Sequence, residues 1–79
     1  MNVKVLFFGA TADSTGEREI SFVIRDDSQA RQILLSIVEK YPKLSSRNLL
    51  FSINQEYSYG DEILSDGDEL AIFTAVSGG

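Results

Sequence analysis

The sequence predicts one α+β domain, in which a mixed sheet of four to five strands carries one main helix on one face. Several short segments alternate apolar and polar residues with the period of two that is typical of strands. Only one longer stretch, residues 30–41, repeats apolar residues at helical spacing. A chain of 79 residues can build only one small core, so we expect a single domain over residues 1–79.

The first two strands are expected to form a hairpin. In residues 3–8 the odd-numbered side chains are all apolar and share one face, while Leu6 and Phe8 make the other face apolar as well. A strand that is apolar on both faces is expected at the centre of the sheet. Residues 9–16 are small and polar and predict a loop, and residues 17–25 alternate clearly and predict the second strand.

The main helix is predicted after the turn at Asp26 and Asp27. Ser28 is the expected N-cap, because its hydroxyl can accept a hydrogen bond from a free first-turn N–H. Pro42 is expected to end the helix. The apolar positions form one stripe that should face the core: Ala30, Ile33, Leu34, Ile37, Val38 and Tyr41.

The third strand is predicted at residues 49–54, after a polar connection over 43–48. Phe51 and Ile53 are its expected core positions. A tight turn at residues 54–55 should lead into a short return strand at 56–58. Residues 61–64 are expected to form a short turn, of 3₁₀ type, that places Ile63 and Leu64 in the core.

The last strand is predicted at residues 70–74, after a turn at 66–68. Leu70 and Ile72 should face the helix, whereas Ala71 and Phe73 should face the opposite side. The order strand, strand, helix, strand, short strand, strand places the first and last strands side by side and parallel. This is the ubiquitin-like β-grasp arrangement. Residues 75–79 lack periodicity and predict a flexible functional tail.

The sequence ends in Gly78-Gly79, and this pair is the strongest indication of function. Glycines can enter a narrow channel, so the Gly79 carboxylate is expected to be presented as a reactive group. The chain has no cysteine and no histidine, which removes thiol nucleophiles and the commonest general base. We therefore expect no catalytic site of its own, no bound cofactor and no metal, and we interpret Asp66, Asp68 and Glu69 as a turn.

The net charge of −5 argues against nucleic acid as a partner, since phosphates would repel the chain. The apolar run near the N-terminus is too short for a signal peptide or a membrane span. The expected location is the cytoplasm, with which the lack of cysteine agrees.

Four segments together resemble the small, sulfur-carrier subunit of molybdopterin synthase. They are Val-Leu-Phe-Phe at 5–8, Ile-Asn-Gln-Glu-Tyr at 53–57, Leu-Ser-Asp-Gly-Asp-Glu-Leu-Ala-Ile-Phe at 64–73 and Val-Ser-Gly-Gly at 76–79. One departure is Thr74-Ala75, where that family usually has one or two prolines.

The resemblance implies that an E1-like enzyme adenylates Gly79 with ATP and magnesium, and that a sulfur donor protein converts the product to a thiocarboxylate. The tail residues Val76, Ser77 and Gly78 would then enter the large subunit of molybdopterin synthase, in a complex with two copies of each subunit. There the sulfur would pass to cyclic pyranopterin monophosphate during molybdenum cofactor biosynthesis.

An exposed apolar patch is expected on the sheet face opposite the helix, and such patches often mark interfaces. In the family, the corresponding positions contact the large subunit and the activating enzyme. The residues concerned are Leu6, Phe8, Ala71 and Phe73, with Tyr57 at the border.

Three other functions stay open on the sequence alone. The chain could be a sulfur carrier for thiamin thiazole synthesis, a ubiquitin-like protein modifier joined to lysines through Gly79, or a binding module with an inert tail.

Overall fold

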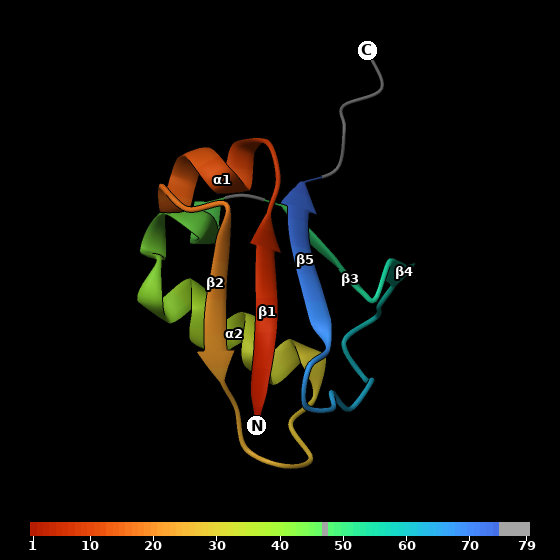
Figure 1. Ribbon diagram of the computed structural model, residues 1–79. Coiled ribbons are helices and arrows are strands. Elements are labelled where there is room, and N and C mark those ends of the chain that lie inside the picture. Colours follow the sequence, from red (N-terminus) through yellow and green to blue (C-terminus); the bar gives the residue numbers. More distant parts are fainter. Residues whose placement is uncertain (47, 75–79) are drawn as a thin grey trace.

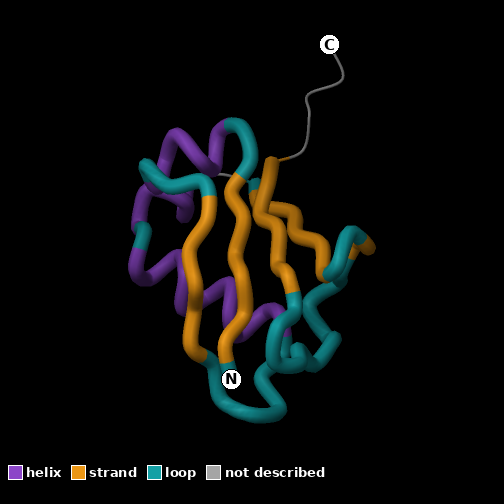
Figure 2. Tube along the Cα trace, viewed as in Figure 1, coloured by secondary structure: helices purple, strands orange, loops and turns teal. Residues whose placement is uncertain are grey.

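A computed structural model describes residues 1–46 and 48–74. Five strands form one sheet in the order β2-β1-β5-β3-β4, and the main helix α2 (Ala30–Lys40) lies on one face of it (Figures 1 and 2). The strands are β1 (Asn2–Phe7), β2 (Glu19–Val23), β3 (Leu49–Ile53), β4 (Glu56–Tyr57) and β5 (Glu69–Thr74). Two shorter helices complete the described chain: α1 (Ala10–Thr15) and η1 (Pro42–Ser46).

Strands β1 and β5 run parallel at the centre of the sheet, with Val5 opposite Leu70 and Phe7 opposite Ile72. The other neighbouring pairs, β1 with β2, β3 with β5 and β3 with β4, are antiparallel. The predicted β-grasp fold and its central parallel pair are therefore confirmed.

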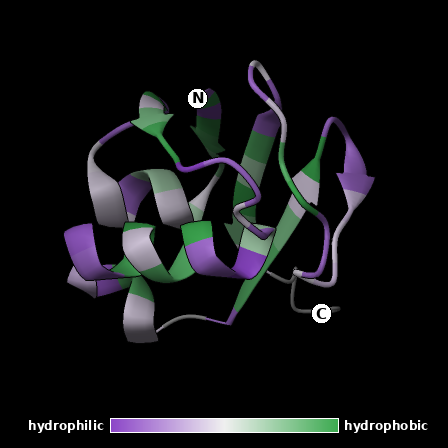
Figure 3. Cartoon of the chain, turned by 90° about the horizontal axis from the view of Figure 1, so that it is seen from below, coloured by the Kyte–Doolittle hydropathy of each residue, from purple (hydrophilic) through white to green (hydrophobic). Residues whose placement is uncertain are grey.

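The core lies between the sheet and α2. Seen from below, the helix forms one layer and the strands the other (Figure 3). Alternate residues of β1 and β5 face this layer because side chains alternate along a strand. The fully or almost fully buried apolar side chains include Val3, Val5, Phe7, Ile33, Ile37, Leu44, Leu64, Leu70 and Ile72.

The loop predicted at residues 9–16 is instead the short helix α1. Gly9 and Gly16 bound it with φ of 56° and 75°, values that favour glycine. Its anchor is a polar residue, Thr11, which is completely buried. Because α1 has no apolar stripe, hydrophobic periodicity could not reveal it.

The start of α2 also differs from the prediction. Gln29, and not Ser28, is the N-cap, and its backbone N–H donates to Oε1 of Gln32 at 2.9 Å. The Ser28 hydroxyl donates instead to the carbonyl of Arg25, at 2.7 Å, and so closes the preceding turn.

Two segments of the C-terminal half need correction. The polar connection after Pro42 contains η1, whose Leu44 is completely buried. Residues 61–64 are extended and form no 3₁₀ turn, and Ile63 pairs with Gln29 in an isolated antiparallel bridge. Leu64 is buried as predicted, but Ile63 is 58% exposed, so its prediction as a core residue was wrong. Neighbouring residues in extended chain point to opposite sides, and only one of them can enter the core.

Candidate functional site: an apolar open face beside the last strand

The sheet face opposite α2 carries a group of apolar side chains, with the polar Ser52 between Ala71 and Tyr57. Leu6 of β1 lies opposite Ala71 of β5, and Leu50 of β3 lies opposite Phe73. We call this surface the open face and define it as Leu6, Phe8, Leu50, Tyr57, Ala71 and Phe73. The five residues predicted to form the patch lie together on this face, whereas their role in binding a partner stays a prediction.

Aromatic rings dominate the open face near the end of β5. The rings of Tyr57 and Phe73 are 5.8 Å apart between centroids and tilted by 59°, and Tyr57 is 74% exposed. Phe8 is 53% exposed and lies just beyond β1. Together with Gly9 and Thr74, the Phe8 and Phe73 side chains line a hollow of about 350 Å³. This hollow therefore adjoins Thr74, after which the sequence continues to Gly79.

Leu50 belongs to the open face and was missed as a site residue. It is 40% exposed, and its neighbour across the strands is Phe73. The signal was present in the sequence, because assigning Phe51 and Ile53 to the core places Leu50 on the other face.

The buried side chain of Thr11 holds the backbone at the end of the site in place. Its hydroxyl lies 2.7 Å from the carbonyl oxygen of Ile72 and 2.8 Å from that of Phe8, and it accepts the N–H of Phe8 at 3.0 Å. One buried side chain therefore ties α1 to the ends of both central strands. This bonding holds Phe8 next to the strand that leads to the tail.

A larger hollow, of about 570 Å³, adjoins the open face at Leu6 and Phe8. Asp13, Arg18 and Glu19 contribute charged groups to its lining. The apolar surface is thus bordered by both signs of charge, as is common where a buried interface centre meets a polar rim.

The acidic turn after Leu64 serves the fold. Asp66 Oδ1 accepts the backbone N–H of Asn2 at 2.7 Å, and Asp68 Oδ2 accepts that of Ser65 at 2.7 Å. Within residues 1–46 and 48–74, no three carboxylates gather as a metal site would require. None of the helices in this same part of the chain is long and apolar enough to cross a membrane.

One exposed carboxylate titrates away from its ordinary range. The Ser58 hydroxyl donates to Oε1 of Glu62 at 2.6 Å, and this bond is the main reason why the pKa of Glu62 is lowered. Backbone N–H groups of the same loop, including that of Glu62 itself, lower this pKa further. A lowered pKa keeps this carboxylate ionised near neutral pH, so it is no proton donor there.

The predicted reactive tail, Val76, Ser77, Gly78 and Gly79, lies outside the described residues. The structure describes the chain up to Thr74 at the end of β5, so the base of the tail is placed and the tail itself is not.

The fold and the open face define a β-grasp domain of the ubiquitin-like class. The chain belongs to the ThiS family, whose model matches residues 5–79. Among its curated relatives is the molybdopterin synthase sulfur carrier subunit of Chlamydomonas reinhardtii, which is 36% identical with all of both chains covered. The protein of the same name from Homo sapiens is 35% identical, over 98% of this chain and 93% of the relative.

Solved structures agree on the fold. SAMP1 from Haloferax volcanii superposes with a TM-score of 0.88 at 26% identity, covering 100% of both chains. A complex of subunits 1 and 2 of the molybdopterin-converting factor from Helicobacter pylori contains a chain that matches with a TM-score of 0.71 at 23% identity, again over the full length of both chains. At that identity the second match supports the fold alone.

Proposed function

We propose that this chain is the sulfur-carrier subunit of a molybdopterin synthase. The observation that carries the proposal is the full-length similarity to the relatives of that name, at 36% and 35% identity. The family match also runs to Gly79, the residue whose carboxylate would carry the sulfur.

The proposed chemistry begins with activation of the Gly79 carboxylate. Its oxygen attacks the α-phosphate of ATP on an E1-like enzyme, with magnesium, and pyrophosphate leaves. A free carboxylate resists nucleophiles, whereas the acyl-adenylate has AMP as a good leaving group. Attack by sulfide, delivered by the sulfur donor, at the acyl carbon then releases AMP and gives the thiocarboxylate. ATP and magnesium would thus be used by the activating enzyme and not held by this chain.

The open face is the proposed docking surface for the large subunit and for the activating enzyme. It is apolar, lies largely on the two central strands and adjoins the base of the tail. Five residues follow Thr74, and a chain of that length reaches at most about 18 Å when fully extended. The reacting carbon would therefore lie within that distance of the docked surface, inside the partner's active site.

The large subunit would supply the groups that transfer the sulfur to cyclic pyranopterin monophosphate. The chain contains no histidine or cysteine that could act as a base or nucleophile. The proposed assembly has two small and two large subunits, with each tail serving one active site.

A second candidate function is modification of other proteins through Gly79. The observation that favours it is the similarity to SAMP1 from Haloferax volcanii, with a TM-score of 0.88 at 26% identity. A second structure from the same organism gives the full name of that protein as small archaeal modifier protein 1. The same acyl-adenylate would serve both functions, and they differ in whether sulfide or a lysine amine receives the acyl group. In thiamin thiazole synthesis, the remaining alternative, the thiocarboxylate would pass its sulfur to the thiazole precursor.

Intact mass spectrometry tests the first step. The chain is incubated with an E1-like adenylating enzyme, ATP, magnesium and sulfide, and we expect its mass to rise by the exchange of one oxygen for sulfur. A variant lacking Gly79 should not gain this mass, whereas Ser77→Ala, which keeps the end of the chain, should. Equal conversion of the shortened variant would refute the assignment of Gly79.

A further inference from the structure

Strand β2 forms one edge of the sheet and has a neighbouring strand only on one side. Strand order places it at the end of the sheet, next to β1 (Figure 1). The backbone N–H of Phe7 donates to the carbonyl of Arg18, and that of Ile24 donates to the carbonyl of Met1. In an antiparallel pair every second residue bonds to the neighbouring strand, so the even-numbered residues from 18 to 24 face β1. The backbone groups of residues 19, 21 and 23 consequently point away from β1, to the free edge.

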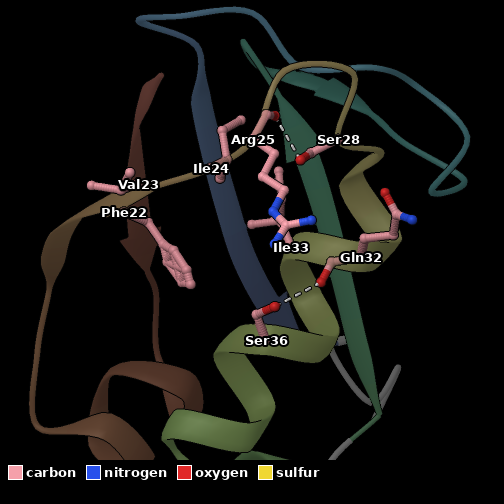
Figure 4. A pocket seen from close by; sticks show the side chains of 8 residues that line it. All are labelled: Phe22, Val23, Ile24, Arg25, Ser28, Gln32, Ile33 and Ser36. Atoms are coloured by element: carbon pink, nitrogen blue, oxygen red, sulfur yellow. Dashed lines mark hydrogen bonds between the residues drawn. The ribbon is translucent and has the colours of Figure 1, made fainter.

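A groove runs between this free edge and α2, with a volume of about 340 Å³. We call it the β2 groove, and its lining is Phe22, Val23, Ile24, Arg25, Ser28, Gln32, Ile33 and Ser36 (Figure 4). Phe22, Ile24 and Ile33 give it an apolar floor. Positions 28, 32 and 36, four residues apart along the chain, give it a polar side.

The polar side is well ordered by its own hydrogen bonds. The Ser28 hydroxyl donates to the carbonyl of Arg25, and that of Ser36 donates to the carbonyl of Gln32 at 3.2 Å (Figure 4). Both bonds use backbone acceptors. Neither occupies the guanidinium of Arg25, which points along the groove toward Ile33 (Figure 4).

The charge of the β2 groove is opposite to that of the chain as a whole. Arg25 is its one charged lining residue, and no acidic side chain lines it. Asp26 and Asp27 follow in the adjoining turn but are not part of the lining. Arg31 pairs with Asp61 on another side of α2, and this is the one ion pair within the described part of the chain. Arg25 therefore has no carboxylate partner among the described residues. A cation of this kind, on a chain of net charge −5, selects for a carboxylate on the occupant.

We infer that the β2 groove binds an extended acidic peptide segment of a partner protein, added to the sheet as a sixth strand. The added strand would lie about 4.8 Å from β2 and bond to the backbone groups of residues 19, 21 and 23. Alternate apolar side chains would rest on Phe22 and Ile33, and an acidic side chain would pair with Arg25. This site is on the free edge of β2, where its first residue, Glu19, lies opposite Leu6 of the open face. The inference does not depend on the proposed function.

The pattern defines the probe: acetyl-Asp-Thr-Val-Thr-Val-Thr-Asp-amide, whose valines and aspartates share one face of the strand. It is acidic at both ends so that either strand direction can reach Arg25. Two control peptides test the two parts of the proposal. One replaces the central Val-Thr with Pro-Pro, which removes N–H groups needed for strand addition. The other replaces both aspartates with lysine.

The experiment is a titration of the ¹⁵N-labelled full chain with each peptide, followed by amide chemical shifts. We expect saturable shifts at residues 19, 21 and 23 and at Gln32, Ile33 and Ser36 with the acidic peptide only. Arg25→Glu should weaken binding at least about tenfold. Lys43→Glu, which changes the net charge equally but lies in η1, should leave binding unchanged.

Several results would overturn the inference. They are unmoved β2 amides at millimolar acidic peptide, equal binding of the Pro-Pro peptide, or shifts confined to Leu6, Ala71 and Phe73 on the open face. Equal weakening by Arg25→Glu and Lys43→Glu would reduce the effect to net charge and would also overturn it. Shifts at the edge that appear with rising protein concentration alone would assign the groove to a second copy of the chain.

Discussion

The two faces of the same central strands have different tasks. Toward α2, β1 and β5 present side chains that are at most 2% exposed, including Phe7, Leu70 and Ile72. Toward the other side they begin with the charged residues Lys4 and Glu69. Leu6, Ala71 and Phe73 follow on this face and are apolar, although no element of the described chain covers them. Folding needs only the first set, because one covered face suffices for a core. The second set is therefore best explained by a partner.

Phe7 and Phe8 allow the sharpest test of this difference, since they are adjacent and lie on opposite sides. Phe7 is 2% exposed and packs edge-on against Tyr41, with ring centroids 5.8 Å apart. We expect Phe7→Ala to lower the free energy of unfolding by about 3–5 kcal/mol, through lost burial and the cavity left behind. Chemical denaturation monitored by circular dichroism measures it. A loss below 1 kcal/mol, on the order of a surface substitution, would contradict the described core.

Phe8→Ala should show the opposite pattern. Because Phe8 is 53% exposed, we expect the free energy of unfolding to change by less than about 1 kcal/mol. Its affinity for the large subunit should fall by about 30-fold, the effect of losing about 2 kcal/mol at an interface centre. Calorimetric titration with the large subunit measures the affinity. Unchanged binding with Phe8→Ala and Phe73→Ala together would show that the open face is not the docking surface.

Thr11→Val tests how much the buried hydroxyl, which joins α1 to the ends of β1 and β5, contributes to stability. Valine has nearly the same shape but cannot bond to the Ile72 carbonyl or to Phe8. We expect a loss of about 1–2 kcal/mol in the free energy of unfolding. Thr11→Ser keeps the hydroxyl and should restore most of the loss. If serine is no better than valine, the methyl group and not the hydroxyl is what matters at this position.

The smallest expected effect concerns the loop beside β4. Because the folded-state pKa of Glu62 is lowered, its ionisation stabilises the fold above the unfolded-state pKa, and this contribution is lost as pH falls through the folded-state pKa. Ser58→Ala removes the main hydrogen bond and should move the Glu62 pKa back toward its ordinary value. An NMR titration of the Glu62 side chain measures it, and an unmoved pKa would assign the shift to the backbone N–H groups instead.

Much of the fold could be predicted from the sequence because it rests on apolar periodicity. The alternation in β1 and β5 and the stripe of α2 gave the sheet, its parallel centre and the face covered by the helix. The same alternation placed Leu6, Ala71 and Phe73 on the open face, and it also contained Leu50, which was overlooked.

What could not be predicted depends on single polar contacts or on side-chain direction. The helix α1 is held by one buried hydroxyl, that of Thr11, whose partner Ile72 is 61 residues away. The N-cap passed from Ser28 to Gln29 because the serine hydroxyl bonds to Arg25, an alternative that local sequence does not decide. Ile63 and Leu64 are equally apolar, and only the path of the chain determines which of them is buried.

The central claim, that Gly79 carries sulfur to a pterin, is tested most directly by a reconstituted transfer assay. The chain, with a chemically made C-terminal thiocarboxylate, is mixed with a molybdopterin synthase large subunit and cyclic pyranopterin monophosphate, and the oxidised pterin product is followed by fluorescence. Our account predicts product with the intact chain, and markedly less at limiting concentration with Phe8→Ala. Absence of product, while a known small subunit works in parallel, would contradict the assignment to this pathway and point to another sulfur acceptor.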